Sequence, residues 1–137
     1  MGTTNSCNGK LSAGTSQKVE SKIMNLTQHA ATAEQVAAGV VEPADKVAVQ
    51  RLLTFVELPT AEDIRERADL LADMGRGYKA AMIGGAPYLM GALEDALRNL
   101  EVKPVYAFSK RESVEKIAED GTVQKTSIFR HVGFVEV

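Results

Sequence analysis

Three segments of the sequence hold residue types that suit a phosphate-bearing ligand. They are NLTQH at 25–29, GGAP at 84–87 and SKRES at 109–113, and each follows an apolar run. Main-chain N–H groups at a helix start bind anions, Lys and Arg add charge, and Asn, Thr and Gln contact a base or sugar. These types indicate a nucleotide-like small molecule, with candidate binding residues Asn25, Thr27, Gln28, Gly84, Gly85, Ala86, Ser109 and Lys110.

The spacing within these segments argues against several familiar enzyme classes. No Gly-Lys-Ser/Thr follows GGAP and no complete G-x-G-x-x-G is present, so neither a P-loop NTPase nor a Rossmann dehydrogenase is indicated. Ser109 lacks Gly-x-Ser-x-Gly surroundings, which argues against an α/β-hydrolase. Gly84 and Gly85 equally fit a tight turn that only packs a helix closely against a strand.

Two residues are candidates for catalysis. His29, in a polar loop, has the side chain of an acid–base group, and Arg111 has that of an anion ligand. The alternatives are a solvated loop histidine and a solvated turn. The other histidine, His131, is far away in sequence and no H-E-x-x-H motif exists, so we expect neither a metal nor a cofactor. The residues leave open whether the protein is an enzyme.

The order of apolar and polar segments predicts the elements that position these residues. Short apolar runs predict strands at 22–26, 78–83 and 102–108, and helical periodicity predicts helices at 32–39, 43–53, 60–74 and 87–100. Thr32 with Gln35, and Thr60 with Asp63, form capping boxes, and Pro43 is expected in the first turn of its helix. VAVQRLL at 47–53 also fits a strand.

The end of the chain has a different pattern. Apolar residues on both sides of Asp120-Gly121 predict a hairpin over 111–129, and a last strand is expected at 131–137. The fold class is therefore α/β, a Rossmann-like sandwich with a short parallel core and a C-terminal antiparallel hairpin extension. Ligands of open parallel sheets bind beyond the carboxyl ends of the strands, so the three polar segments are expected to share one crevice.

Composition narrows the possible partners. The 137 residues suit one domain, which we place at 22–137, after a polar leader at 1–21 that is expected to be disordered. With 16 basic and 18 acidic residues, the chain has no overall positive field for a long nucleic acid. No apolar run reaches the roughly 18 residues of a membrane helix. The lone Cys7 fits a reducing compartment, so a cytoplasmic protein is expected.

The stretch MIGGAPYLMGAL at 82–93 resembles the nucleotide-sensing domains of CRISPR systems, the CARF domains and related ring nucleases. That resemblance implies a Rossmann-like fold that binds cyclic oligoadenylates, with Gly84, Gly85 and Met90 in matching positions. The Thr and Lys usual after Gly-Gly are replaced by Ala86 and Pro87, so binding would depend on backbone amides and on Lys110 or Arg111. The chain also looks like a family of small single-domain proteins from bacteria and their phages.

The resemblance implies a metal-independent cleavage. A ribose 2′-hydroxyl held in line attacks its neighbouring phosphate, and His29 or Arg111 would assist. One alternative is a non-catalytic interaction protein whose hairpin pairs with another chain by edge addition, and another is a small-molecule transferase. Because one small domain offers a shallow crevice, a homodimer is expected to close it.

Overall fold

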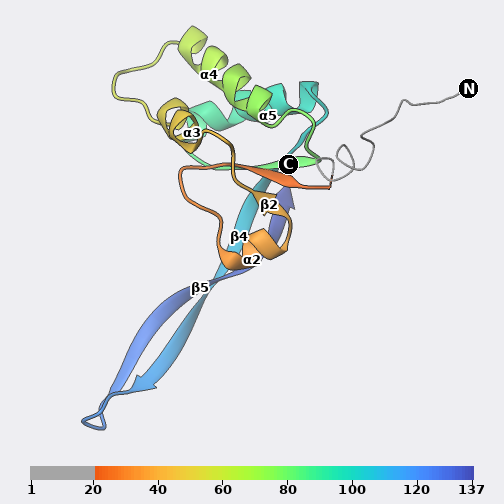
Figure 1. Cartoon of the computed structure of the whole chain (residues 1–137). Helices are drawn as coiled ribbons and strands as arrows, with labels where there is room; N and C mark the ends of the chain where they lie inside the picture. The colour runs from red at the N-terminus through yellow and green to blue at the C-terminus, as the bar shows by residue number, and fades with distance from the viewer. Residues whose placement is uncertain (1–20) are drawn as a thin grey trace, which may run out of the picture.

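The computed structural model describes residues 21–137, which form a five-stranded sheet flanked by helices (Figure 1). The sheet order is β2-β1-β3-β4-β5, and the first four strands run parallel while β5 is antiparallel to β4. This arrangement confirms the predicted α/β class with its antiparallel C-terminal pair. The strands are β1 (Ile23–Leu26), β2 (Val40–Val41), β3 (Ala80–Ile83), β4 (Lys103–Ile117) and β5 (Val123–Glu136). Apart from Ser21, the predicted disordered leader lies outside the described residues.

Local capping interactions set where the helices begin. The side chains of Thr32 and Thr60 each accept a hydrogen bond from the backbone amide three residues on. The side chains of Gln35 and Asp63 in turn accept from the backbone amides of Thr32 and Thr60, so both predicted capping boxes are confirmed. The helices are α2 (Ala33–Ala37), α3 (Lys46–Leu53), α4 (Ala61–Met74) and α5 (Pro87–Asn99). Across the described residues, every helix falls short of the length and apolar character that a bilayer span requires.

The start of α3 was predicted wrongly. Pro43 lies outside the helix, which begins at Lys46 because the Asp45 carboxylate accepts a hydrogen bond from the Ala48 amide at 3.0 Å. Asp is among the strongest N-cap residues, so this bond outweighs the preference of proline for a first turn. The two-residue strand β2 was also missed, since a strand this short has no periodicity to read.

Two apolar clusters lie on opposite faces of the sheet. The larger one joins β1 and β3 to α3, α4 and α5, which lie together on one side of the sheet (Figure 1). Its fully buried leucines include Leu26, Leu71, Leu89, Leu93 and Leu97. The smaller cluster consists of Ile23, Val40, Ala80, Met82 and Val105. The short helix α2 lies apart from the other three helices, beside β2 (Figure 1).

The C-terminal region forms two long strands, which corrects the sequence prediction. The expected strand at 102–108 and the first hairpin strand are one continuous β4, and the second hairpin strand and the last strand are one continuous β5. A register shift between Phe108 and Ser109 leaves Val132 as an extra residue in β5, and pairing resumes beyond it. The predicted Asp120-Gly121 turn is confirmed, with Gly121 at a φ of 86° between the strand ends.

Candidate functional site

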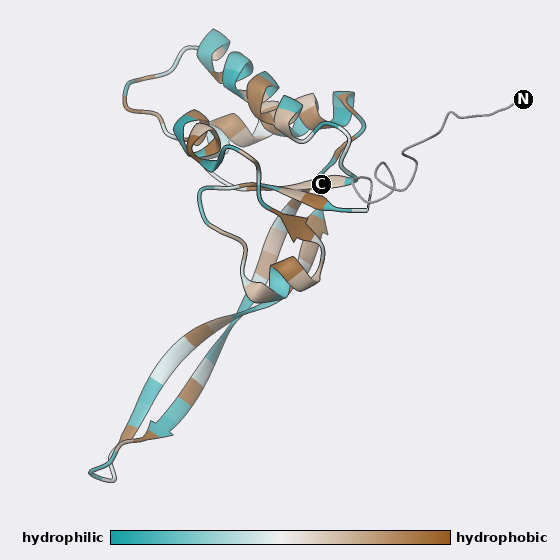
Figure 2. Cartoon of the chain, in the orientation of Figure 1, coloured by the Kyte–Doolittle hydropathy of each residue, from teal (hydrophilic) through white to brown (hydrophobic). Residues whose placement is uncertain are grey.

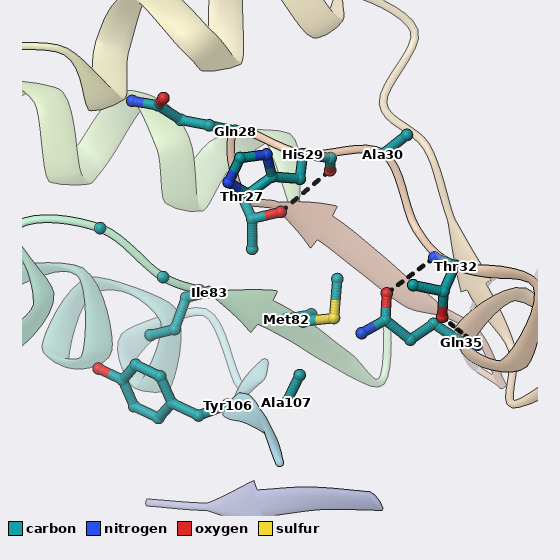
Figure 3. A pocket seen from close by; sticks show the side chains of 12 residues that line it. Thr27, Gln28, His29, Ala30, Thr32, Gln35, Met82, Ile83, Tyr106 and Ala107 are labelled. Carbon is teal, nitrogen blue, oxygen red and sulfur yellow. Dashed lines mark hydrogen bonds between the residues drawn. The ribbon is translucent and has the colours of Figure 1, made fainter. Parts of the chain in front are cut away.

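A pocket of about 640 Å³ lies at the carboxyl ends of β1 and β3, beside Tyr106 and Ala107 of β4 (Figure 3). This volume falls within the roughly 300–1,000 Å³ typical of small-molecule sites. The pocket is lined by the loop after β1, the turn after β3, the N-terminal residues of α2 with its cap, and residues 106–107 of β4. Its lining residues are Thr27, Gln28, His29, Ala30, Thr32, Gln35, Met82, Ile83, Gly84, Gly85, Tyr106 and Ala107.

Two of the three predicted segments meet at this pocket. Thr27, Gln28 and His29 line it from the first segment, and Gly84 and Gly85 line it from the second. Asn25 and Ala86 adjoin it without lining it. Parallel strands end at the same edge of a sheet, so the loops that follow β1 and β3 are brought together.

The third segment is in a different environment from the one predicted. Ser109, Lys110 and Arg111 are not in a loop after a strand, because β4 continues through them, paired with β5. Lys110 lies opposite Arg130 and Arg111 opposite Phe129, and neither cation lines the pocket. Among the described residues, the pocket wall therefore contains no lysine or arginine.

Asn25 holds the loop that forms one wall of the pocket. Its side chain is fully buried, and its Nδ2 donates to the His29 carbonyl at 2.9 Å and to both Glu42 carboxylate oxygens at 3.1 Å. Its Oδ1 accepts from the Thr27 amide at 3.0 Å and from the Thr27 hydroxyl at 2.7 Å. Asn25 is thus a positioning residue: it fixes Thr27 and His29 rather than presenting itself to a ligand.

Lys46, at the start of α3, joins the same network. Its Nζ donates to the Thr27 carbonyl at 2.7 Å and the His29 carbonyl at 3.0 Å, and lies 3.4 Å from the Glu42 carboxylate. Glu42 also accepts from the Ala31 amide at 2.6 Å. The ammonium group is therefore engaged by loop carbonyls and a carboxylate, and its charge supports the loop rather than the pocket.

The two glycines after β3 have different structural constraints. Gly85 has a φ of 155°, and an added Cβ would lie 3.4 Å from Met90 Cε and 3.5 Å from Leu53 Cδ2. At Gly84 the nearest atom to an added Cβ is Thr27 Cγ2 at 3.7 Å, an ordinary contact. Both added Cβ atoms would make ordinary contacts, so the positive φ accounts for glycine at position 85, whereas position 84 has no such constraint.

Beside these glycines, α5 begins with free backbone donors. Pro87 occupies its first position and has no N–H group, and Ala86 supplies no side-chain cap. Among the described residues, the amides of Gly85 and Ala86 have no hydrogen-bond acceptor. A helix start carries a partial positive charge of roughly half a unit, so this turn can receive an anionic group.

Tyr106 borders the pocket with its ring, while its hydroxyl is already engaged. The hydroxyl donates to Glu94 Oε2 at 2.7 Å on α5. Burial, followed by the hydrogen bond to Glu94 and the charge of that carboxylate, raises the pKa of Tyr106 well above its usual range. The phenol therefore stays protonated and offers the pocket an apolar face, not an acid or a base.

A comparison with family models assigns the chain to a family. The model described as "Uncharacterized protein MJ1673 family" matches residues 21–135, which include every residue of the pocket wall. The chain belongs to this MJ1673 family. Neither a curated protein nor a solved structure matches it. The family description specifies no ligand or reaction, so the resemblance of this MJ1673 family protein to CARF domains stays a prediction.

Sequence reasoning missed several pocket residues of this MJ1673 family protein. Thr32 and Gln35 were interpreted only as a helix cap, and Met82 and Tyr106 only as strand residues. The sequence did contain a signal for Met82 and Tyr106. Each lies near the end of the apolar run that predicts a buried parallel strand. Nothing in the local sequence indicates Lys46, whose contacts with the 27–29 loop depend on the packing of α3.

The Glu42 network predicts a pH-dependent stability. Burial acts to raise the pKa of Glu42, but hydrogen bonds from the Ala31 amide, Asn25 and Lys46 outweigh it, so the pKa lies below its ordinary 4.5. The folded state thus favours the ionised form, and this stabilisation, present above the ordinary pKa, is lost as pH falls through the lowered value. Thermal unfolding followed by circular dichroism should give wild type a higher Tm than Glu42→Gln at about pH 7. This difference in Tm should disappear below about pH 4.

A gap in Tm that stays constant across this pH range would contradict the role of the Glu42 charge. Glu101→Gln is the matched control, because Glu101 is an exposed carboxylate in a turn. Its Tm should follow that of wild type through the whole series.

Proposed function

We propose that the pocket at the carboxyl ends of β1 and β3 binds a nucleotide or a nucleotide-derived signal. The observation that carries this proposal is the convergence of the 27–30 loop and the Gly84-Gly85 turn on one ligand-sized pocket beside free amides at the start of α5. Small-molecule sites combine apolar walls with a few directed polar groups, and this pocket has that composition.

The proposed pose assigns each part of the ligand to a different wall. A phosphate contacts the amides of Gly85 and Ala86, where the dipole of α5 adds positive potential. A base lies against Met82 and Ala107, which are on the same side of the sheet as α2. Gln35 is buried, and its Oε1 accepts from the Thr32 amide at 3.0 Å, which leaves its Nε2 turned toward the pocket and able to bind a base edge (Figure 3).

The charge of the pocket specifies the kind of phosphate. Because no lysine or arginine lines it among the described residues, positive potential comes only from amides and the helix dipole, worth roughly half a unit charge. A phosphodiester carries one negative charge, and the phosphate of AMP carries about two. In a cyclic oligonucleotide the phosphodiesters are spaced around the ring, so that one can contact the turn while the others stay in solvent. The triphosphate of ATP instead joins several charges on adjacent phosphates, whose desolvation this wall would not compensate. The proposed ligand is therefore a mononucleotide or a cyclic oligonucleotide rather than a nucleoside triphosphate.

Cleavage of a bound phosphodiester is the second candidate function, favoured by His29 in the pocket wall. Its imidazole would accept the proton of a ribose 2′-hydroxyl as that oxygen attacks the neighbouring phosphorus. The bond to the 5′-oxygen then breaks, and the imidazolium or a water molecule protonates that oxygen, giving a 2′,3′-cyclic phosphate and a 5′-hydroxyl. Arg111 has no part in this proposal because β4 places it outside the pocket wall.

A thermal-shift experiment tests binding. Cyclic tetraadenylate or AMP should raise the Tm of the full chain, whereas adenosine, without phosphate, and ATP should shift it much less. A ligand at 100 times its Kd adds about 2.7 kcal/mol to the free energy of unfolding. Chromatography of the incubated ligand then shows whether a 2′,3′-cyclic phosphate forms.

Two isosteric variants test the phosphate position. Gly84→Asp should abolish the ligand-induced shift because a carboxylate would face the phosphate, while Gly84→Asn, equal in size and neutral, should keep most of it. Both substitutions have steric room at Cβ. If no nucleotide at about millimolar concentration shifts the Tm of folded wild type, or if the Asp and Asn variants respond alike, the proposed phosphate site is wrong.

A further inference from the structure

Beyond the pocket, β4 and β5 continue as a two-stranded ribbon. Paired residues run from Ser109 opposite His131 to Ile117 opposite Val123, and the ribbon projects away from the rest of the described chain (Figure 1). No helix of the described chain lies alongside its far half (Figure 1). A two-stranded hairpin alone is only marginally stable in water, and a third strand or a covering layer is what normally stabilises it. The exposed surfaces of the ribbon are therefore candidates to receive such a layer.

Large apolar side chains are exposed on both faces of the ribbon. Directly opposed residues of antiparallel strands share a face. Ile117, Val123 and Phe129 share one face and are 79%, 58% and 72% exposed, while Ile128, 39% exposed, lies on the other face with the half-buried Val114. Hydrophobic and hydrophilic bands alternate along the ribbon (Figure 2). Exposed apolar side chains gathered in one segment of a small protein mark an interaction surface.

The charges of the ribbon indicate the kind of partner. Between residues 109 and 130 basic and acidic side chains are nearly balanced, although Lys110 is directly opposite Arg130. Arg130 Nε lies 3.0 Å from Glu112 Oε1, and Glu115 is opposite Lys125. A nucleic acid would require an excess of cations. A surface that carries positive and negative side chains in similar number can complement a second copy of itself.

The outer edge of β5 provides the geometry for such a contact. β5 is the last strand of the sheet and, among the described residues, pairs with β4 alone along Val123–Glu136. A long open edge is a template for strand pairing, and two identical edges pair antiparallel about a two-fold axis. We infer that β5 pairs with β5 of a second copy of this chain, which turns two ribbons into one four-stranded sheet.

We place the two-fold axis of this pairing at Ser127, a register that the charge pattern permits. Centring the two-fold axis on Ser127 places Lys125 of one copy opposite Phe129 of the other and Gln124 opposite Arg130. No like charges are then directly opposed, and the exposed Val123 and Phe129 side chains of both copies come onto one face. Four strands with an apolar face meet the requirement for stability that a single hairpin does not.

Light scattering coupled to size-exclusion chromatography tests the pairing in the full chain. Wild type should have twice the 14.7 kDa mass of one chain at about 100 μM, a concentration far above the Kd of a specific dimer. Phe129→Lys places a lysine opposite Lys125 twice per dimer and should raise the dimer Kd at least about tenfold, so that in a dilution series the variant dissociates at a correspondingly higher concentration than wild type. Phe129→Glu places a carboxylate there instead and should leave the protein dimeric.

Val56→Lys is the matched control, since Val56 is 88% exposed in the loop after α3, remote from the ribbon in sequence. It should remain a dimer. A monomeric wild type would overturn the inference. So would a result in which Val56→Lys dissociates the dimer and Phe129→Lys leaves it intact. Circular dichroism confirms that each variant is folded.

Disulfide trapping tests the register. In a Cys7→Ser background, Ser127→Cys should form a covalent dimer on mild oxidation because residue 127 would face its own copy. Ser113→Cys, on the other strand of the ribbon, should not. Absence of the Ser127→Cys crosslink in a dimeric protein would overturn the proposed pairing.

Discussion

Asn25→Leu should lower the free energy of unfolding by about 2–4 kcal/mol. The two side chains are similar in size, so the loss comes from hydrogen bonding rather than from a cavity. The fully buried side-chain amide of Asn25 forms hydrogen bonds with Thr27, His29 and Glu42 at the same time. Leucine would leave the Thr27 amide without its acceptor and the Glu42 carboxylate without one of its donors, and each unsatisfied group costs about 1–3 kcal/mol.

Urea denaturation followed by circular dichroism measures this loss. Asn99→Leu makes the same chemical change at an exposed residue, the last of α5, and should alter stability by less than about 0.5 kcal/mol. Because Asn25 positions the 27–29 loop, its variant should also bind nucleotide more weakly at temperatures where it is still folded. Equal stabilities of the Asn25 and Asn99 variants would show that the network contributes little.

Leu71→Ala should cost about 3–5 kcal/mol, at the upper end for removal of a buried leucine. Leu71 on α4 is fully buried in the larger core, where α4 packs on α5 and α3. Alanine would remove its contacts and leave a cavity that the surrounding leucines of α5 fill only partly. Alanine's higher helix propensity offsets only a few tenths of a kcal/mol.

The neighbouring residue provides the control within the same helix. Leu70 is 49% exposed, so Leu70→Ala removes the same atoms from a partly solvated position and should cost less than about 1 kcal/mol. Denaturant unfolding of both variants gives the difference directly. Similar losses for the two would contradict the packing of α4 on α5 and α3.

Several elements were predictable because they depend on neighbouring residues. The capping boxes at Thr32 and Thr60 form between residues three positions apart, and their hydrogen bonds occur where the sequence indicated. The apolar stripe of α5 and the short apolar run of β3 likewise identify buried faces from periodicity alone. Where two local signals competed, as with Pro43 and Asp45, sequence reasoning chose the weaker one.

The pocket was predictable in part. Loops after parallel strands share one edge of the sheet, so the convergence of residues 27–29 with Gly84 and Gly85 follows from the order of the elements. The assignment of Lys110 and Arg111 to the same edge was wrong, because β4 extends as far as its partner β5 supports it. That support comes from residues up to 22 positions away in the ribbon, as for Ser109 and His131.

The sequence by itself determined the fold class, most helix boundaries and two walls of the candidate pocket, because short-range hydrogen bonds and the period of apolar residues specify them. Tertiary structure alone decided that Asn25, Glu42 and Lys46 brace the pocket loop, that cations are absent from the described pocket wall, and that the C-terminal strands project as a ribbon. Each of these depends on contacts between residues distant in the chain, and no local pattern encodes them.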